Sequence, residues 1–240
     1  MELMGQMSPD FLALAFIRYM VFLFSTTCHE AAHALAAKLG GDLTAFHSGQ
    51  VSLSPLPHIR REPFGMVLMP LIGLFLGGAV IGWASAPYDP VWRARNPKRA
   101  AWMALAGPAA NFTLVLLAAI LIHAGLFAGA FQPPERLNSL HLVDGRDSVT
   151  SGVATVLSVV FSLNLLLGFF NLLPIPPLDG FSAIGVVLPL RAIRAWDRFG
   201  DSIRAYSFLG LILGWRLVDM IYWPIFGLGV RLLYPSLMYR

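Results

Sequence analysis

Charged residues are scarce in this chain. Asp, Glu, Lys and Arg make up 12% of its 240 residues, whereas soluble domains carry about 25%. Apolar residues make up 57%, above the roughly 45–50% of soluble domains. The net charge is only +4, and the Lys and Arg residues lie between apolar stretches, so they form no patch for nucleic acid. This composition excludes an ordinary soluble domain and predicts a protein of the lipid bilayer.

Cysteine is also scarce, and internal repeats and low-complexity tracts are absent. Cys28 is the only cysteine, which excludes an intrachain disulfide. The first apolar stretch has an acidic N-terminal flank and no small-residue cleavage site, so we do not expect a removable signal peptide. The length leaves no room for a separate soluble module of usual size, so we expect one membrane-embedded domain over residues 1–240.

Long apolar stretches predict an all-α, multi-pass membrane protein, because a spanning helix needs about 20 mostly apolar residues. One stretch of that length, Phe64–Trp83, is interrupted by Pro70 and several glycines, so it either crosses the membrane or dips in and returns. We therefore predict a bundle of about four to six transmembrane helices. Four further stretches have the required length: Phe11–Ala37, Ala100–Leu126, Gly152–Leu173 and Tyr206–Val230.

Three less apolar segments connect these stretches. Gly40–Glu62 alternates apolar residues with Ser, Gly and Pro, which predicts a short β-hairpin at the membrane edge. Gln132–Asp147 reads as a polar loop. Arg191–Arg204 spaces its apolar residues for one helix face, which is typical of an amphipathic helix lying in the membrane interface.

The distribution of Lys and Arg favours one topology. If Phe64–Trp83 crosses the membrane, the two sides carry 8 and 7 of these residues; if it re-enters, they carry 11 and 4. Positive residues favour the cytoplasmic side, so the re-entrant arrangement is preferred. It predicts an outside N-terminus and a site nearer the cytoplasmic face of the cell membrane.

The metal-binding motif H-E-x-x-H ends the first apolar stretch, at His29, Glu30 and His33. On a helix this spacing places two imidazoles on one face, one turn apart, where they can bind one zinc ion. The glutamate between them can act as a general base toward a zinc-activated water. The motif therefore predicts hydrolytic zinc chemistry inside a membrane protein.

A catalytic zinc site needs a third protein ligand. Asp179 is the best candidate, because it follows an apolar helix that is broken by Pro174, Pro176 and Pro177, and Gly180 permits a sharp turn there. An ionisable residue at a break in a membrane helix is a functional-site hypothesis by default. The other histidines are expected at the surface, in the hairpin or in loops: His47, His58, His123 and His141.

Together, the H-E-x-x-H motif and the later N-x-x-P-x-P-x-L-D-G motif strongly resemble the site-2 protease family of intramembrane zinc metalloproteases. Ala106–Asn111 is similar to that family's Gly-Pro-x-x-Asn element, and Gly82–Pro97 is similar to a membrane-edge segment of compact bacterial and archaeal members. This chain shows no PDZ or CBS domain, as in those compact members. Its Ser85-Ala-Pro sequence departs from the usual Lys-Pro-Val run of the membrane-edge segment.

The resemblance implies a role for each matching residue. His29, His33 and Asp179 would hold one Zn²⁺ per chain, and Glu30 would activate water and then protonate the leaving amine. Two asparagines are expected to position the substrate backbone or support the oxyanion, or else to cap the broken helix and join helices: Asn171 and Asn111.

The implied function is cleavage of peptide bonds within or next to the transmembrane segments of other membrane proteins. The alternatives are a non-proteolytic zinc-binding membrane protein, or inactive family member, that binds partners, and an ion transporter that uses the buried His and Asp residues. An intact Glu30 disfavours the first, because a purely structural zinc site needs no base. The sequence leaves the substrate and the oligomeric state open.

Overall fold

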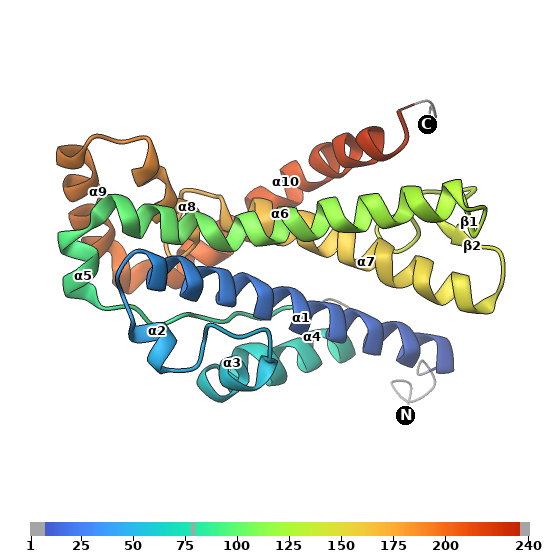
Figure 1. Cartoon of the computed structure of the whole chain (residues 1–240), viewed down its shortest axis with the longest axis horizontal. Helices are drawn as coiled ribbons and strands as arrows, with labels where there is room; N and C mark the ends of the chain where they lie inside the picture. Colours follow the sequence, from blue (N-terminus) through green and yellow to red (C-terminus); the bar gives the residue numbers. More distant parts are fainter. Residues whose placement is uncertain (1–7, 78–79, 236–240) are drawn as a thin grey trace.

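The computed structural model of the chain describes residues 8–77 and 80–235, and within these it is almost entirely helical. Figure 1 shows long helices lying lengthwise, with short helices gathered at one end and a pair of short strands at the other. Three of the long helices are α1 (Pro9–Leu39), α6 (Pro97–Phe127) and α7 (Ser148–Asn171), and α6 packs along both of the others.

Three helices among the described residues are long and apolar enough to cross a membrane, namely α1, α6 and α7. They contain the predicted stretches Phe11–Ala37 and Ala100–Leu126 and nearly all of the third. The fourth stretch, Tyr206–Val230, lies almost entirely within helix α10 (Ser207–Leu233), which is not among these three helices. The predicted all-α membrane class is therefore supported, while the predicted number of four to six membrane helices is not confirmed.

The long helices begin at residues suited to that role. The Ser8 hydroxyl accepts a hydrogen bond from the Phe11 amide at 3.1 Å, and Pro9 occupies the first turn of α1. A reciprocal pair of hydrogen bonds between Asp147 and Thr150 begins α7. These local signals position the helix starts, and apolar burial then sets how the helices pack.

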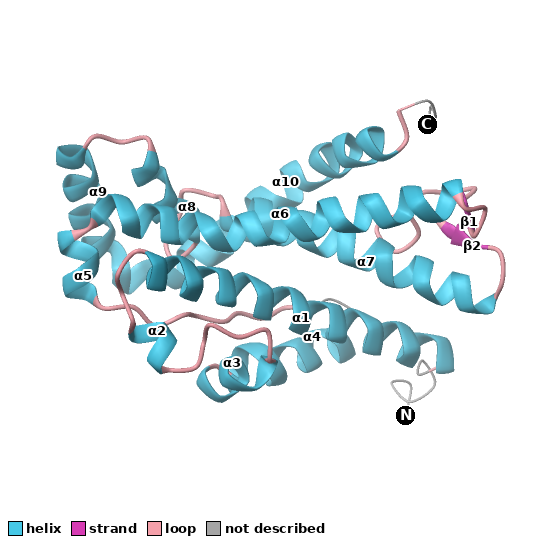
Figure 2. Ribbon diagram, viewed as in Figure 1, coloured by secondary structure: helices cyan, strands magenta, loops and turns pink. Residues whose placement is uncertain are grey.

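The predicted β-hairpin over Gly40–Glu62 is wrong. The segment forms two short helices, α2 (Thr44–His47) and α3 (Pro55–Arg61), as Figure 2 shows. Two helix-start signals outweigh the alternating pattern: Asp42 accepts hydrogen bonds from the backbone and hydroxyl of Thr44, and Ser54 caps a helix with proline in its first turn. The only described strands are β1 (Phe131–Gln132) and β2 (Asp144–Gly145), at the ends of the predicted polar loop.

The interrupted apolar segment turns back on itself. It begins with a π-helical turn (η2, Phe64–Leu68) and continues as α4 (Met69–Gly77); residues 78–79 of the segment lie outside the described residues. Near its far end, the Trp83 amide donates to the Gly65 carbonyl at 3.1 Å. A helix of about 13 residues is only about 20 Å long, shorter than the roughly 30 Å hydrocarbon core. These two observations favour the re-entrant arrangement over a full crossing.

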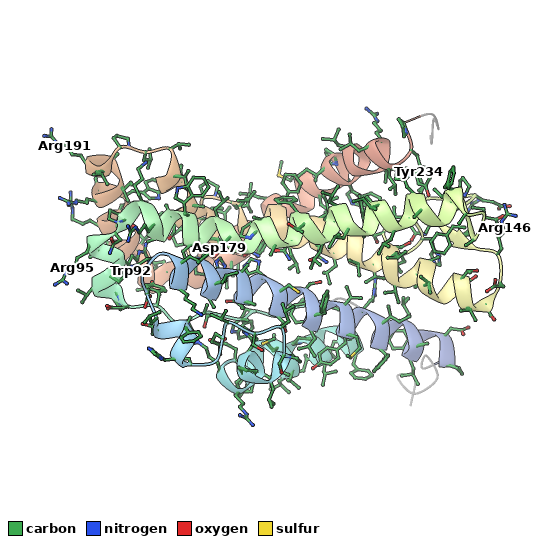
Figure 3. All side chains as sticks on the ribbon, viewed as in Figure 1. Trp92, Arg95, Arg146, Asp179, Arg191 and Tyr234 are labelled. Carbon is green, nitrogen blue, oxygen red and sulfur yellow. The ribbon has the colours of Figure 1, made fainter. Side chains whose placement is uncertain are left out.

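Short helices surround the end of the molecule at which α1 finishes and α6 begins. They are α5 (Pro90–Arg95), α8 (Asp179–Ala183) with the 3₁₀ turn η3 (Ile184–Val186), and α9 (Leu190–Ile203), which is followed by the 3₁₀ turn η4 (Arg204–Tyr206). The predicted amphipathic helix at Arg191–Arg204 is thus α9. Figure 3 shows Arg95 and Arg191 at this end, Arg146 at the opposite end, and Asp179 between them, closer to the short helices.

An apolar cluster holds the opposite end together. Ile122 on α6 and Phe161 on α7 pack there with Leu142 and Val143 of the loop and with Phe226 of α10. The Ser158 hydroxyl accepts a hydrogen bond from the Leu142 amide at 2.9 Å. This end contains none of the predicted site residues, so the functional site belongs to the other half of the long helices.

Candidate functional site

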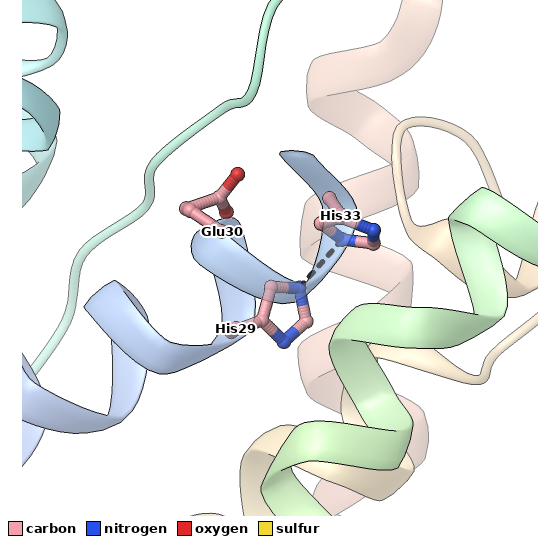
Figure 4. A group of neighbouring side chains, drawn as sticks. All are labelled: His29, Glu30 and His33. Carbon is pink, nitrogen blue, oxygen red and sulfur yellow. Dashed lines mark hydrogen bonds between the residues drawn. The ribbon is translucent and has the colours of Figure 1, made fainter. Parts of the chain in front are cut away.

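Two distant parts of the chain meet at one small cluster of ligand atoms. The Nε2 atoms of His29 and His33 lie 3.0 Å apart, and the Asp179 Oδ2 atom lies 3.0 Å from the first and 3.3 Å from the second. Figure 4 shows the two imidazole rings, one turn apart on α1, with their nitrogen atoms facing each other. The structure therefore brings together all three predicted metal ligands.

Helix geometry and a glycine place these side chains. The spacing of four residues puts both histidines on one face of α1. Asp179 begins α8, immediately after the proline-rich break that follows α7. A side chain at Gly180 would overlap the backbone carbonyl of Leu172 at the end of α7, so only glycine lets α8 approach this closely.

The three ligand atoms are all hydrogen-bond acceptors. The Nδ1 atom of His33 lies 2.7 Å from the Met103 carbonyl, which can only accept, so this nitrogen carries the proton and Nε2 of the neutral ring does not. The Nδ1 atom of His29 likewise lies 2.7 Å from Asn111 Oδ1. Two bare imidazole nitrogens and a carboxylate oxygen within about 3 Å of one another repel unless a cation lies among them. With both rings neutral, this donor set therefore fits a metal ion.

The spacing fits zinc. Tetrahedral ligands about 2.0–2.1 Å from zinc lie about 3.3 Å from each other, close to the observed separations of 3.0–3.3 Å. Space is also reserved: a methyl group at Gly107 of α6 would overlap the Nε2 atoms of both histidines. Three protein ligands leave a fourth zinc position for water or substrate, as in catalytic sites.

Glu30 lies beside this cluster, on the neighbouring side of α1 (Figure 4). His29, Glu30 and His33 each offer a ligand atom within 4.8 Å of the others, and all three are buried. The Oε2 atom of Glu30 has no hydrogen-bond partner among the described residues. A buried carboxylate oxygen without a partner is costly in a folded protein, which marks this one as a group available to water or substrate.

A cavity of about 240 Å³ opens beside the cluster. Glu30, His33 and Asp179 line one side of it, and the extended segment from Ala84 to Tyr88 lines another. The cavity therefore brings the metal-ligand cluster next to a stretch of extended backbone.

Arg93 of α5 joins the walls of this cavity. Its guanidinium donates to the Tyr88 hydroxyl at 3.0 Å, to Ser182 Oγ of α8 at 3.3 Å and to Asp197 Oδ1 of α9 at 2.9 Å. Burial acts against the charged form, but the contacts with Tyr88 and Asp197 raise the pKa of Arg93 above its usual value. The residue stays charged and fixes α8, and with it Asp179, against α5 and α9.

A sequence profile of peptidase family M50 matches residues 17–213, a range that contains both metal motifs. The chain belongs to peptidase family M50, the site-2 protease family. The resemblance expected from the two motifs is thereby confirmed.

Three M50 relatives cover most of this chain. "Putative zinc metalloprotease YwhC" of Bacillus subtilis (strain 168) is 31% identical over 221 residues, which are 90% of this chain and 89% of that protein. "Putative zinc metalloprotease Rip2" of Mycobacterium tuberculosis (Erdman) is 29% identical over 205 residues, covering 84% and 70% of the two chains. "Putative zinc metalloprotease Rip3" of the same organism is 30% identical over 186 residues, or 78% of this chain and 33% of Rip3. No solved structure matches this M50 chain at a significant level.

The two predicted asparagines do not line the cavity of this M50 protein as described. Asn111 is fully buried on α6, and both ends of its amide are hydrogen-bonded, to His29 and to Asn164 of α7. Asn171 donates to the Leu167 carbonyl of its own helix at 3.0 Å. Contact of either side chain with substrate stays a prediction.

Sequence reasoning missed two residues near the M50 site. His58 was expected as a polar group at the surface or in the hairpin, but it is only 1% exposed, and its Nε2 atom lies 3.0 Å from the Ser52 carbonyl. Asn164 was not considered, although it lies two turns before Asn171 in an apolar helix, and an uncharged polar residue there signals a contact between helices. The remaining histidines are exposed, as expected: His47, His123 and His141.

Proposed function

We propose that this M50 protein is a zinc endopeptidase that hydrolyses peptide bonds within or next to the transmembrane segments of other membrane proteins. The observation that carries the proposal is the convergence of Asp179 with His29 and His33 at 3.0–3.3 Å. The two histidines and the neighbouring Glu30 belong to α1, which is long and apolar enough to cross a membrane. The relatives, each of which carries the name "Putative zinc metalloprotease", support the same chemistry.

One Zn²⁺ would be held by the two Nε2 atoms and the Asp179 carboxylate. When bound, zinc supplies Lewis-acid polarisation of the scissile carbonyl and activation of water at neutral pH. The remaining steps belong to side chains of this chain, which bind the substrate and move protons.

Glu30 is the proposed general base. Its free Oε2 atom lies at the cavity wall, next to His33 and Asp179, where it can accept a proton from the attacking water. The same carboxyl group then passes the proton to the nitrogen of the leaving amine, which completes cleavage of the peptide bond. Glu30 thus acts twice, and neither step needs another titratable residue.

The extended segment 80–89 is the proposed docking edge for the substrate. A transmembrane helix shields its carbonyls in internal hydrogen bonds, so it must unwind before cleavage. Among the described residues, no hydrogen bond joins the backbone amides of Ala84 and Ala86 to the rest of the protein. Arg61 Nε donates a hydrogen bond to the Ser85 carbonyl at 3.0 Å, and the Ser85 hydroxyl donates one to Glu62. These two bonds hold the segment against the end of α3. An unwound substrate can therefore add to this edge as a strand.

The proposed topology places the site nearer the cytoplasmic face and the N-terminus outside. Gly40 and Asp42, after α1, contact the segment between Asp89 and Arg99, through bonds such as Trp92 Nε1 to the Gly40 carbonyl at 3.0 Å. These two positively charged connections thus lie at the same end, as the uneven distribution of Lys and Arg requires. A reporter inserted after Pro63 should be scored as cytoplasmic; an extracellular result would refute the topology.

The test of function is cleavage by purified protein in detergent and in liposomes, with a panel of single-span substrates. Wild type should release fragments, whereas Glu30→Gln should bind one zinc ion and release none. Equal cleavage by the two proteins would refute the assigned base. Zinc binding by both with no fragments from either would favour the non-proteolytic alternative, in which the protein binds membrane partners.

A further inference from the structure

A chain of buried polar side chains extends from the metal-ligand cluster across α1, α6 and α7. We name it the amide relay: His29 on α1, Asn111 on α6, Asn164 on α7 and Ser25 on α1 again. The two asparagines and Ser25 are fully buried, and His29 is 6% exposed. The links measure 2.7 Å from His29 Nδ1 to Asn111 Oδ1, 2.8 Å from Asn111 Nδ2 to Asn164 Oδ1, and 2.8 Å from Asn164 Nδ2 to Ser25 Oγ.

The direction of every link follows from one backbone carbonyl. Asn164 Nδ2 also lies 2.8 Å from the Val160 carbonyl, which can only accept a hydrogen bond. The nitrogen end of the Asn164 amide must therefore face Val160 and Ser25, so its oxygen faces Asn111. If the amide were turned over, two carbonyl oxygens would face each other without a proton.

The same constraint passes to the histidine. Because the Asn164 oxygen faces it, Asn111 must present its NH₂ group to Asn164 and its Oδ1 atom to His29. The Nδ1 atom of His29 must then carry the ring proton, which leaves Nε2 with a free lone pair directed at His33 and Asp179. In metal sites, partners of this kind orient the ligand ring and select its tautomer.

We infer that Asn164 is a positioning residue for the metal site, which acts through Asn111 to fix the tautomer and orientation of His29. This inference rests on the proposed function, because it assumes that the three-ligand cluster binds zinc. It assigns Asn111 to holding His29 instead of contacting the substrate. The relay is part of the protein interior, because none of its four members lines the described cavity.

The two histidines differ in how they are supported. His33 donates to the Met103 backbone carbonyl, a partner that no substitution removes. His29 depends on two side chains from two other helices, and so on the packing of α6 against α7. Zinc affinity should therefore respond to a substitution at position 164, although this residue lies two hydrogen bonds away from the ligand ring.

The test measures zinc affinity by competition with a chelator, per folded protein, in detergent. Substitution of an outer partner typically weakens metal binding about 10–100-fold, and that loss is expected for both Asn164→Leu, which is similar in size, and Asn164→Ala. Ser162→Ala is the matched control: Ser162 is a buried residue of the same helix whose hydroxyl has no hydrogen-bond partner among the described residues. Its zinc affinity should equal that of wild type.

Two further measurements separate positioning from general destabilisation. Combining Asn111→Leu with Asn164→Leu should weaken zinc binding no more than Asn111→Leu alone, because both break one relay. The absorption bands of cobalt-substituted protein should change in Asn164→Leu and not in Ser162→Ala, because they report on the ligand geometry.

The outcomes distinguish this inference from the proposed function. Wild-type affinity in both Asn164 variants, or losses that multiply in the double variant, would overturn the relay and leave the peptidase proposal intact. Failure of wild type itself to bind zinc would overturn both. Weaker binding in the Asn164 variants, with an unchanged Ser162→Ala, would support the relay even if no substrate is cleaved.

Discussion

The pair of helices α6 and α7 is held together in two different ways along its length. At the end near the metal-ligand cluster, Asn111 and Asn164 join the helices through a buried hydrogen bond of 2.8 Å. At the other end, Ile122 and Phe161 pack in an apolar cluster with the loop and α10. Lipid chains are as apolar as these side chains, so apolar contact alone gives little preference for one helix partner. Buried amides, in contrast, satisfy their hydrogen bonds in only a few arrangements of the helices. The metal-ligand cluster lies at the end that is held by these amides.

The largest expected effect comes from filling the space among the ligands. Gly107→Ala should abolish stoichiometric zinc binding, a loss above the roughly 100-fold expected for outer partners, because the added methyl group would overlap both Nε2 atoms. Metal analysis of the purified variant measures it. Gly152→Ala on α7 is the control, since nothing lies within 4 Å of its added methyl group. Full zinc occupancy in Gly107→Ala would show that the metal lies elsewhere.

The second-largest effect is expected from removal of the third proposed ligand. Asp179→Ala takes away the carboxylate that lies 3.0 and 3.3 Å from the two histidines, so the protein should lose bound zinc during purification and release no fragments. Its helical content, measured by circular dichroism, should match that of wild type. Stoichiometric zinc retained in this variant would remove Asp179 from the ligand set.

A substitution at the apolar end should lower the stability of the protein and leave zinc binding unchanged. Ile122→Ala opens a cavity in the cluster and should lower the free energy of unfolding by about 2–5 kcal/mol, because the side chain is fully buried. Zinc affinity per folded molecule should stay at the wild-type level. A large change in affinity would mean that the two ends are coupled, which contradicts the division drawn above.

The smallest expected effect concerns how the stability of the protein depends on pH, through Asp42 in the connection after α1. Asp42 is buried; burial opposes its charge, but hydrogen bonds from Thr44 and from the Asp89 amide lower the pKa of its carboxyl group. A carboxyl group whose pKa is lower in the folded state stabilises the folded protein fully at a pH above its unfolded-state pKa of about 4. This stabilisation is lost as the pH falls through the folded-state pKa.

Asp42→Asn should therefore lower stability at pH 7 by about 1 kcal/mol, and the difference from wild type should shrink as the pH falls below about 4. Thermal unfolding in detergent between pH 3 and pH 7 measures it. A difference that stays constant over this range would show that the charge of Asp42 contributes nothing.

Local sequence patterns predicted the long helices and failed at short connections. The apolar stretch Phe11–Ala37 lies within α1, because the length of an apolar run is a strong signal in itself. Gly40–Glu62 was predicted as a hairpin from its alternating residues, but the Ser54 cap of α3 and the hydrogen bonds of Asp42 to Thr44 ahead of α2 favour short helices there. In segments this short, one capping hydrogen bond outweighs a weak alternating pattern.

The sequence alone determined that two histidines and a glutamate share a turn of an apolar helix, because H-E-x-x-H is a matter of helical spacing. It also indicated Asp179, because prolines break the helix in front of it. Only the tertiary structure decided that Gly107 faces the Nε2 atoms of both histidines and that hydrogen bonds join Asn164 to Asn111 and Asn111 to His29, since these relations join residues of different helices. Helical periodicity is a local property, whereas the direction of a buried amide depends on every partner around it.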